Sequence, residues 1–109
     1  MNVRMDGTSL RFKITESELE ELLEGKVIVN QLPIGGVAMT LLIDPKPVLQ
    51  EGMYAQCLTE KDSAVLRLMV GAEKLEQLKA MGKSRDGISV TNAGTTLYLL
   101  VDARKTRVG

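Results

Sequence analysis

Residues 1–26, MNVRMDGTSLRFKITESELEELLEGK, decide the fold, because they combine two alternating apolar and polar runs with a short amphipathic stretch. The two runs flank Asp6-Gly7, a pair typical of a type I′ turn, and therefore predict a β-hairpin. Thr15 and Glu18 have the spacing of a capping box, which predicts that a helix begins directly after the hairpin. Gly25 supplies the left-handed residue at which that helix is expected to end.

Two further strands are expected to complete this unit. Residues 27–29 and 37–43 are rich in valine, isoleucine and leucine, which predicts strands, and residues 32–36 are expected to connect them. Asp44 is expected to end the unit, because the prolines that follow it lack the N–H needed to continue a ladder of hydrogen bonds. The first unit is therefore ββαββ over residues 1–44.

Residues 53–83, MYAQCLTEKDSAVLRLMVGAEKLEQLKAMGK, repeat the order hairpin then helix after a linker at residues 45–52. A helix is expected at residues 72–81, followed by two strands that end at Asp102. Several identities recur at matching places in the two halves: Leu10-Arg11 and Leu66-Arg67, Leu19 and Leu75, Gly25-Lys26 and Gly82-Lys83, Gly36 and Gly94, and Asp44 and Asp102. These matches predict an internal duplication with halves at 1–44 and 53–102.

The predicted fold is a single α+β domain with about eight antiparallel strands and two short helices. Its sheet is expected to be either open or barrel-like, and its halves to be related by a pseudo-twofold axis. The strands at 37–43 and 97–101 are apolar on both faces. Such a strand is either buried centrally or packed on its second face against another subunit, so both readings stay open.

Composition limits the partners and the location of the chain. Fourteen basic residues balance fourteen acidic ones, so nucleic acid is not an expected partner. Two basic groups, Lys79 with Lys83 and Arg85, and Arg104 with Lys105 and Arg107, lack the aromatic side chains on which bases stack. No apolar run is long enough to span a bilayer and no signal peptide precedes the hairpin, which indicates a cytoplasmic protein without membrane contact.

The residue inventory also limits the chemistry. The chain has no histidine and one cysteine, Cys57, which excludes an internal disulfide, a cysteine-rich zinc site and the usual histidine-activated nucleophiles. Cys57 lies within an apolar run and is expected to be buried and unreactive. The glutamates of the first helix are expected to form its solvated face rather than a metal site. No metal or cofactor is therefore expected, and catalytic residues are unknown.

The duplication indicates where a site would lie. Arg11 and Arg67 are equivalent, and a twofold axis that brings them together would form a site for an anion. Asp44 and Asp102 are equivalent in the same way and would form a pair of carboxylates suited to acid–base chemistry. The alternatives are arginines that face water and aspartates that end strands.

Residues 3–18, VRMDGTSLRFKITESE, and residues 97–101, LYLLV, resemble the opening and closing segments of a small bacterial family of unknown function. Members of that family begin with a hairpin of alternating basic and apolar residues followed by Leu-Thr-x-Ser-Glu, and close with an apolar strand. The resemblance implies a shared fold and no particular activity.

Two classes of function remain. A non-catalytic binding or oligomerising module, with a second copy of the chain or another protein as partner, fits the missing histidine, the balanced charge and the two-faced strands. The alternative is a small-molecule or anion-binding protein, or an enzyme, with a site at the pseudo-twofold axis. The first class is favoured. A test of either class begins with the residues at the pseudo-twofold axis.

Overall fold

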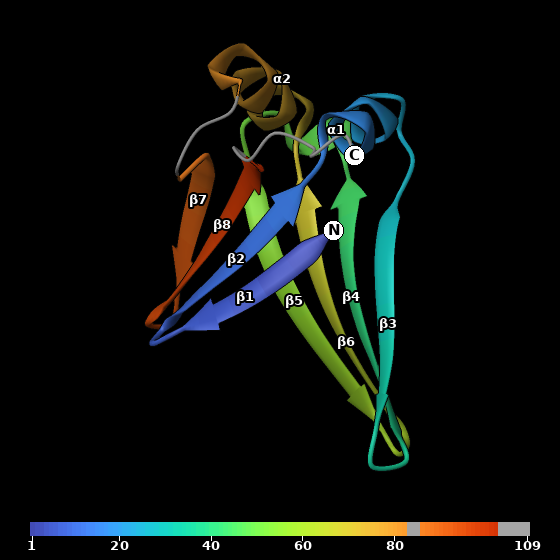
Figure 1. Ribbon diagram of the computed structural model, residues 1–109. Helices are drawn as coiled ribbons and strands as arrows, with labels where there is room; N and C mark the ends of the chain where they lie inside the picture. The colour runs from blue at the N-terminus through green and yellow to red at the C-terminus, as the bar shows by residue number, and fades with distance from the viewer. Residues whose placement is uncertain (83–85, 103–109) are drawn as a thin grey trace, which may run out of the picture.

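A computed structural model describes residues 1–82 and 86–102 of the chain (Figure 1). In these residues eight strands and two α-helices follow one another as ββαββ, twice. They are β1 (Asn2–Asp6), β2 (Ser9–Ile14), α1 (Glu16–Leu23), β3 (Ile28–Ile34), β4 (Val37–Pro45), β5 (Met53–Glu60), β6 (Ser63–Val70), α2 (Ala72–Met81), β7 (Ile88–Asn92) and β8 (Thr95–Val101). The predicted α+β class and the repeated order of elements are confirmed.

The described strands form two mixed four-stranded sheets, neither of which closes into a barrel. The first sheet has the order β1-β2-β8-β7, and the second has the order β3-β4-β6-β5. All four hairpins are antiparallel, but the central pairs β2–β8 and β4–β6 are parallel, so the all-antiparallel prediction is wrong at these pairs. Turn residues specify only how neighbours along the chain pair, and both central pairs join strands from different halves.

The two halves exchange hairpins. If the halves trade places, the order of the first sheet becomes β5-β6-β4-β3, which is the order of the second sheet. The hydrogen bonds at the centre of each sheet therefore connect one half of the chain to the other. Each half of the chain contributes one of its two hairpins to the first sheet and the other to the second sheet.

The register of the repeat differs from the predicted one. The N–H of Asp102 donates to the carbonyl of Ile14, and the N–H of Lys46 donates to that of Val70, both at 2.8 Å. Because Ile14 and Val70 occupy the same place in the repeat, Asp102 corresponds to Lys46, and its predicted match with Asp44 is wrong by two residues. The cause is that β3 and β4, with 7 and 9 residues, are each two residues longer than β7 and β8, with 5 and 7.

Helix α1 forms where the capping box predicts it. The N–H of Glu18 donates to the Thr15 hydroxyl, and the N–H of Thr15 donates to the Glu18 carboxylate, each at 3.0 Å. Gly25 has φ +90° just beyond the helix, as expected for the left-handed residue there. The first hairpin turns one residue later than predicted, at residues 7 and 8, with Gly7 at φ +59°.

Strand β3 continues through residues that were expected to be a connector. It pairs with β4 from Ile28 to Ile34, and only Gly35-Gly36 form the turn. Pro33 is accommodated because its partner Ala38 donates its N–H to Asp62, beside β6, at 2.9 Å. The missing N–H of Pro33 therefore faces the open edge of the sheet, where a proline is tolerated.

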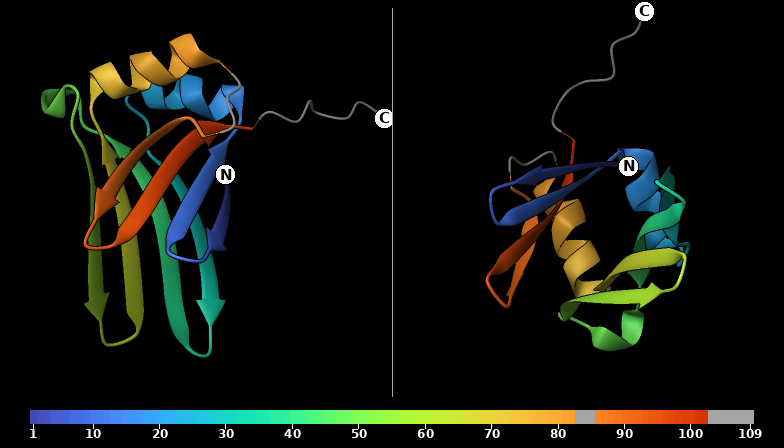
Figure 2. Two further views of the ribbon diagram at one scale, coloured as in Figure 1. Left: turned by 90° about the vertical axis from the view of Figure 1, so that its left-hand side faces the viewer. Right: turned by 90° about the horizontal axis from the view of Figure 1, so that it is seen from below.

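The hydrophobic core lies between the two sheets at the end where α1 and α2 cover them (Figures 1 and 2). It includes Phe12, Ile14, Leu97, Leu99 and Val101 of the first sheet, Ile28, Ile43, Leu68 and Val70 of the second, and Leu19, Leu22, Leu75 and Leu78 of the helices. Neither described helix is long and apolar enough to cross a membrane.

The second sheet projects beyond the first, away from the helices (Figure 2). Its strands have 7 to 9 residues, whereas those of the first sheet have 5 to 7. We call the half of the second sheet farther from the helices the distal sheet and define it as residues 30–34, 37–41, 57–60 and 63–66. The face that continues the core is its inner face, and the opposite one is its outer face.

Candidate functional site

The two arginines that were predicted to meet lie in different sheets. Arg11 is on β2 of the first sheet, where it donates to Asp86 at 3.1 Å and its guanidinium lies 4.3 Å from the centre of the Tyr98 ring. Arg67 is on β6 of the second sheet, where Nε donates to Asp44 at 2.8 Å and Nη2 donates to the same oxygen. Each arginine is therefore held beside a carboxylate, and the anion-binding role stays a prediction.

The two aspartates are likewise on different sheets. Asp44 is near the end of β4, its side chain is 10% exposed, and the Lys46 ammonium lies 3.5 Å away. Asp102 follows β8 of the first sheet. Since Arg67 also contacts Asp44, the carboxylate of this aspartate has two cationic partners, and its contact with Arg67 joins β4 to β6. Its role in a catalytic pair stays a prediction.

Glu18 is another carboxylate with defined partners, and its side chain is 19% exposed. Burial by itself raises its pKa, but a hydrogen bond from the Met1 ammonium at 2.7 Å, the N–H of Thr15 and the charge of the ammonium outweigh that effect. The pKa of Glu18 therefore lies below its ordinary value, and the carboxylate ties the start of the chain to the start of α1.

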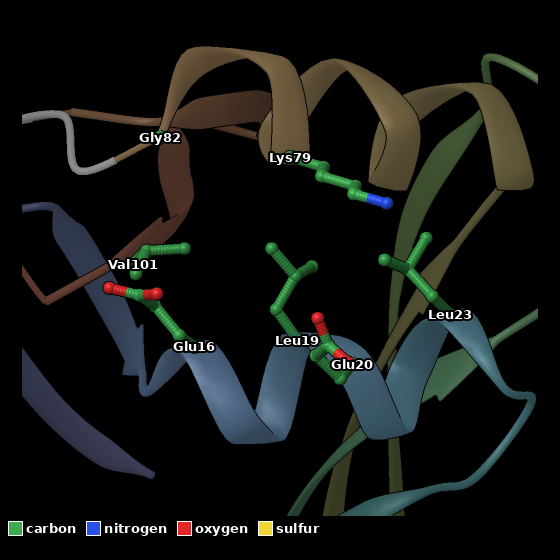
Figure 3. Close-up of a pocket in the computed structure, with 7 residues that line it drawn as sticks. All are labelled: Glu16, Leu19, Glu20, Leu23, Lys79, Gly82 and Val101. Carbon is green, nitrogen blue, oxygen red and sulfur yellow. The ribbon is translucent and has the colours of Figure 1, made fainter.

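A pocket of about 380 Å³ lies between α1 and α2 (Figure 3). The two helices are equivalent elements of the duplicated unit and pack against each other, so the pocket lies where the two halves meet. Its lining comprises Glu16, Leu19, Glu20 and Leu23 of α1, Lys79 and Gly82 at the end of α2, and Val101 of β8. The two leucines line its base, and Lys79 extends over it from α2 toward the Leu23 end, away from Glu16 (Figure 3).

The chemistry of this pocket is that of a small amphipathic site. Its volume is within the range of small-molecule sites, which is roughly 300 to 1,000 Å³. Its three charged side chains, Glu16, Glu20 and Lys79, are all exposed, so water screens them and their positions are adjustable. Such a site binds by apolar contact and weak charge pairing rather than by fixed hydrogen bonds.

The distal sheet is the other candidate surface, and it exposes large aliphatic side chains on both faces. On the inner face, Leu32 is 59% exposed and Ile34 is 54% exposed, and on the outer face Leu58 is 49% exposed. Large aliphatic side chains that cluster at this exposure are typical of interaction sites.

The β3–β4 hairpin of this surface carries no charge. From Val27 to Ile43 the sequence has no Asp, Glu, Lys or Arg, although β3 is an edge strand of its sheet. Natural edge strands are usually protected from association by charged residues or proline, and here Pro33 alone does so. Two apolar runs separated by two glycines are a hairpin signal that would have revealed β3, but residues 32–36 were assigned to a connector.

Cys57 is exposed, so the prediction of a buried cysteine is wrong. It lies on β5 opposite Leu66 and on the inner face, in the part of the sheet that the first sheet does not cover. The apolar run around it is real, but burial depended on a covering element that is absent from the described part of the chain.

Comparison of the chain with protein-family models, with curated proteins and with solved structures finds no match. The resemblance to a bacterial family therefore stays a prediction from the quoted residues. Within residues 1–82 and 86–102, no group of three or more acidic or cysteine side chains could hold a metal ion. Of the basic residues considered above for nucleic acid, Lys83, Arg85, Arg104, Lys105 and Arg107 lie outside the described residues.

Proposed function

We propose that this chain is a non-catalytic module that binds another polypeptide through its distal sheet. The observation that carries the proposal is the uncharged hairpin at residues 27–43, whose inner-face side chains Leu32 and Ile34 are more than half exposed. Burying a leucine or isoleucine side chain stabilises a complex by about 1.5 to 3 kcal/mol relative to leaving it in water.

The contacts of the polar candidates support a binding role. Arg67 and Asp44 satisfy each other, and the same pair holds β4 to β6, so their chemistry is used within the fold. With no histidine in the chain, proton transfer near neutral pH would need another group with a suitable pKa. The proposal also places the protein in the cytoplasm and in the resembled bacterial family, as predicted from the sequence.

Site-specific photo-crosslinking tests the proposal. Benzoyl-phenylalanine is placed at Leu32 on the inner face and, as a control, at Ser89, an exposed residue on the outer side of β7. In cells that produce the protein, we expect position 32 to form cross-links to a discrete polypeptide, either the chain itself or another protein, and position 89 to form few. Equal cross-linking from both positions, or none from either, would contradict the proposal.

A second candidate is a small-molecule protein with its site in the pocket between α1 and α2. The favouring observation is the pocket itself, because a cavity of about 380 Å³ lies where the halves meet. Ligand-observed NMR with a set of amino-acid-sized zwitterions tests it. Binding that Lys79→Ala weakens would support this function, whereas binding unchanged by this substitution, or no binding at all, would contradict it.

A further inference from the structure

We propose that the polypeptide bound by the distal sheet is a second copy of this chain, and that the two copies pack inner face against inner face in a closed twofold dimer. This inference rests on the proposed function and adds the identity of the partner and the face that it contacts.

The inner face is chosen because it is uncharged throughout. Its residues are Asn30, Leu32 and Ile34 of β3, Val37, Met39 and Leu41 of β4, Cys57 and Thr59 of β5, and Ala64 and Leu66 of β6. The same face carries the buried core residues Ile28 and Ile43 closer to the helices. The outer face of the second sheet, by contrast, carries Glu60 and Arg67. A partner on the inner face would therefore extend the existing core.

A second copy suits this face because of the symmetry of a dimer. In a twofold dimer each patch meets an identical patch, so a charged patch would place like charges opposite each other. An uncharged aliphatic patch has no such repulsion. The inner face can therefore pack against an identical face without repulsion between like charges.

The inner face is accessible to a second copy, because Leu32 is 59% exposed and Ile34 is 54% exposed. The two sheets diverge away from the helices, and the second sheet extends farther from the helices than the first (Figures 1 and 2). At that end of the first sheet, Met5 is 79% exposed and pairs with Leu10, which packs against the core. The distal sheet of a second copy packed on the inner face would therefore also be able to contact the flexible, apolar side chain of Met5.

Packing of faces is favoured over pairing of edges at β3. A strand added to the β3 edge would need hydrogen bonds from the groups that point outward there, and Pro33 has no N–H at this position. Side-chain packing across the face makes no such demand on the backbone.

The size of the face predicts a reversible dimer. Four strands spaced about 4.8 Å apart, with about five residues each at about 3.3 Å per residue, present roughly 300 Å² of sheet per copy. Stable specific interfaces bury about 800 Å² of accessible surface per partner. The accessible surface of this face exceeds its flat area because side chains protrude from it, but the contact is small for a stable interface even with Met5 included. We therefore expect dissociation in the micromolar range.

Sedimentation velocity and light scattering of the purified chain test the dimer between about 1 µM and about 500 µM. We expect the mass to rise from that of one chain, 11.9 kDa, to twice that value and no further. Leu32→Lys, on the inner face, should keep the mass at that of one chain throughout. Leu58→Lys is the matched control, because it changes a similarly exposed leucine on the outer face of the same distal sheet and should leave the dimer intact.

Four results would overturn the inference. The first two concern the unchanged protein: a mass of one chain at every concentration, or a mass that rises beyond two chains. The other two concern the variants: loss of the dimer in Leu58→Lys but not in Leu32→Lys, or the same dependence of mass on concentration in both variants and the unchanged protein. If the chain is monomeric while Leu32 still cross-links to a different protein in cells, the inference fails and the proposed function stands. If neither occurs, both fail.

Cys57 provides a second measurement that does not depend on how Leu32→Lys folds. It lies on the inner face of the unmodified protein, so a dimer should shield its thiol from a reagent such as dithionitrobenzoate. We expect modification to slow by at least about fivefold when the chain is concentrated well above its dissociation constant. As a control, a Cys57→Ser chain with Ser89→Cys should react at one rate at all concentrations, and a Cys57 rate that is independent of concentration would overturn the inference.

Discussion

At the scale of single residues, the two halves hold equivalent arginines against carboxylates of very different exposure. Asp44 is 10% exposed, whereas Asp86, the partner of Arg11, is 62% exposed. Water weakens the second pair much more than the first, although both are arginine–aspartate contacts. Exposure therefore determines what each pair contributes to stability.

This difference predicts unequal effects of the same substitution. Asp44→Asn should lower the free energy of unfolding by about 1 to 3 kcal/mol, because it removes a charge-assisted hydrogen bond from a side chain that is nearly buried. Asp86→Asn should change it by less than about 0.5 kcal/mol. Urea denaturation at neutral pH measures both, and equal losses would show that the Asp44 contacts are as weak as exposed ones.

A second prediction at this scale concerns pH. Because the folded-state pKa of Glu18 lies below its ordinary value of 4.5, its ionised form stabilises the fold above that pH, and the contribution disappears as the pH falls through the folded-state value. Glu18→Gln should therefore lower the free energy of unfolding by about 1 kcal/mol at pH 7. Urea titrations should show that loss shrinking toward zero as the pH falls below 4.5 and through the folded-state value, and a loss that stays constant with pH would contradict the assignment.

At the scale of elements, α2 receives its N-terminal cap from the linker rather than from a side chain. Gly71 precedes the helix and provides no side-chain cap. Instead, the carbonyl of Gln50 accepts the N–H of Glu73 at 3.0 Å, and the N–H of Gly71 donates to Gly52 at 2.8 Å. Gln50 adopts φ +53° in this arrangement. The linker between the halves is therefore fastened to the second helix.

Gly71→Ala tests this contact. A Cβ at this position would lie 2.0 Å from the carbonyl oxygen of Gln50, so either the linker or the helix must move. We expect a loss of about 2 kcal/mol or more in the free energy of unfolding. Glu73→Ala, in the same helical turn, is the control and should change stability by less than about 0.5 kcal/mol. A neutral Gly71→Ala would mean that the linker is not held against α2.

At the scale of the whole molecule, the difference in strand length between the sheets divides each long strand into a covered and an uncovered half. Ile28 and Leu32 lie on the same strand and the same face, four residues apart. Ile28 is 7% exposed, and Leu32 is 59% exposed. Their position along the strand, rather than their residue type, determines how much each side chain contributes to the stability of the monomer.

Alanine substitutions should show this division. Ile28→Ala should cost about 2 to 4 kcal/mol of unfolding free energy, because it leaves a cavity in the core. Leu32→Ala should cost less than about 1 kcal/mol when measured at a protein concentration low enough to keep the chain monomeric. A similar cost at both positions would show that the distal sheet is covered within one chain.

The sequence by itself determined the features that depend on residues close together in the chain. The capping box of α1, the bounds of α2 and the repeated order of elements were predicted correctly, because each follows from hydrogen bonds or periodicity within one or two turns or strands. The prediction was wrong at residues 32–36, where a local hairpin signal was interpreted as a connector although β3 continues to Ile34.

Only the tertiary structure decided how the hairpins combine. Nothing local specifies that β2 pairs with β8 and β4 with β6 in parallel, that Arg11 meets Asp86 while Arg67 meets Asp44, or that the distal sheet is left uncovered. These outcomes depend on which distant strands share a sheet and on how far each sheet extends. The surface we propose for binding follows from that mismatch in length, because burial is a property of the neighbouring element as much as of the apolar residue itself.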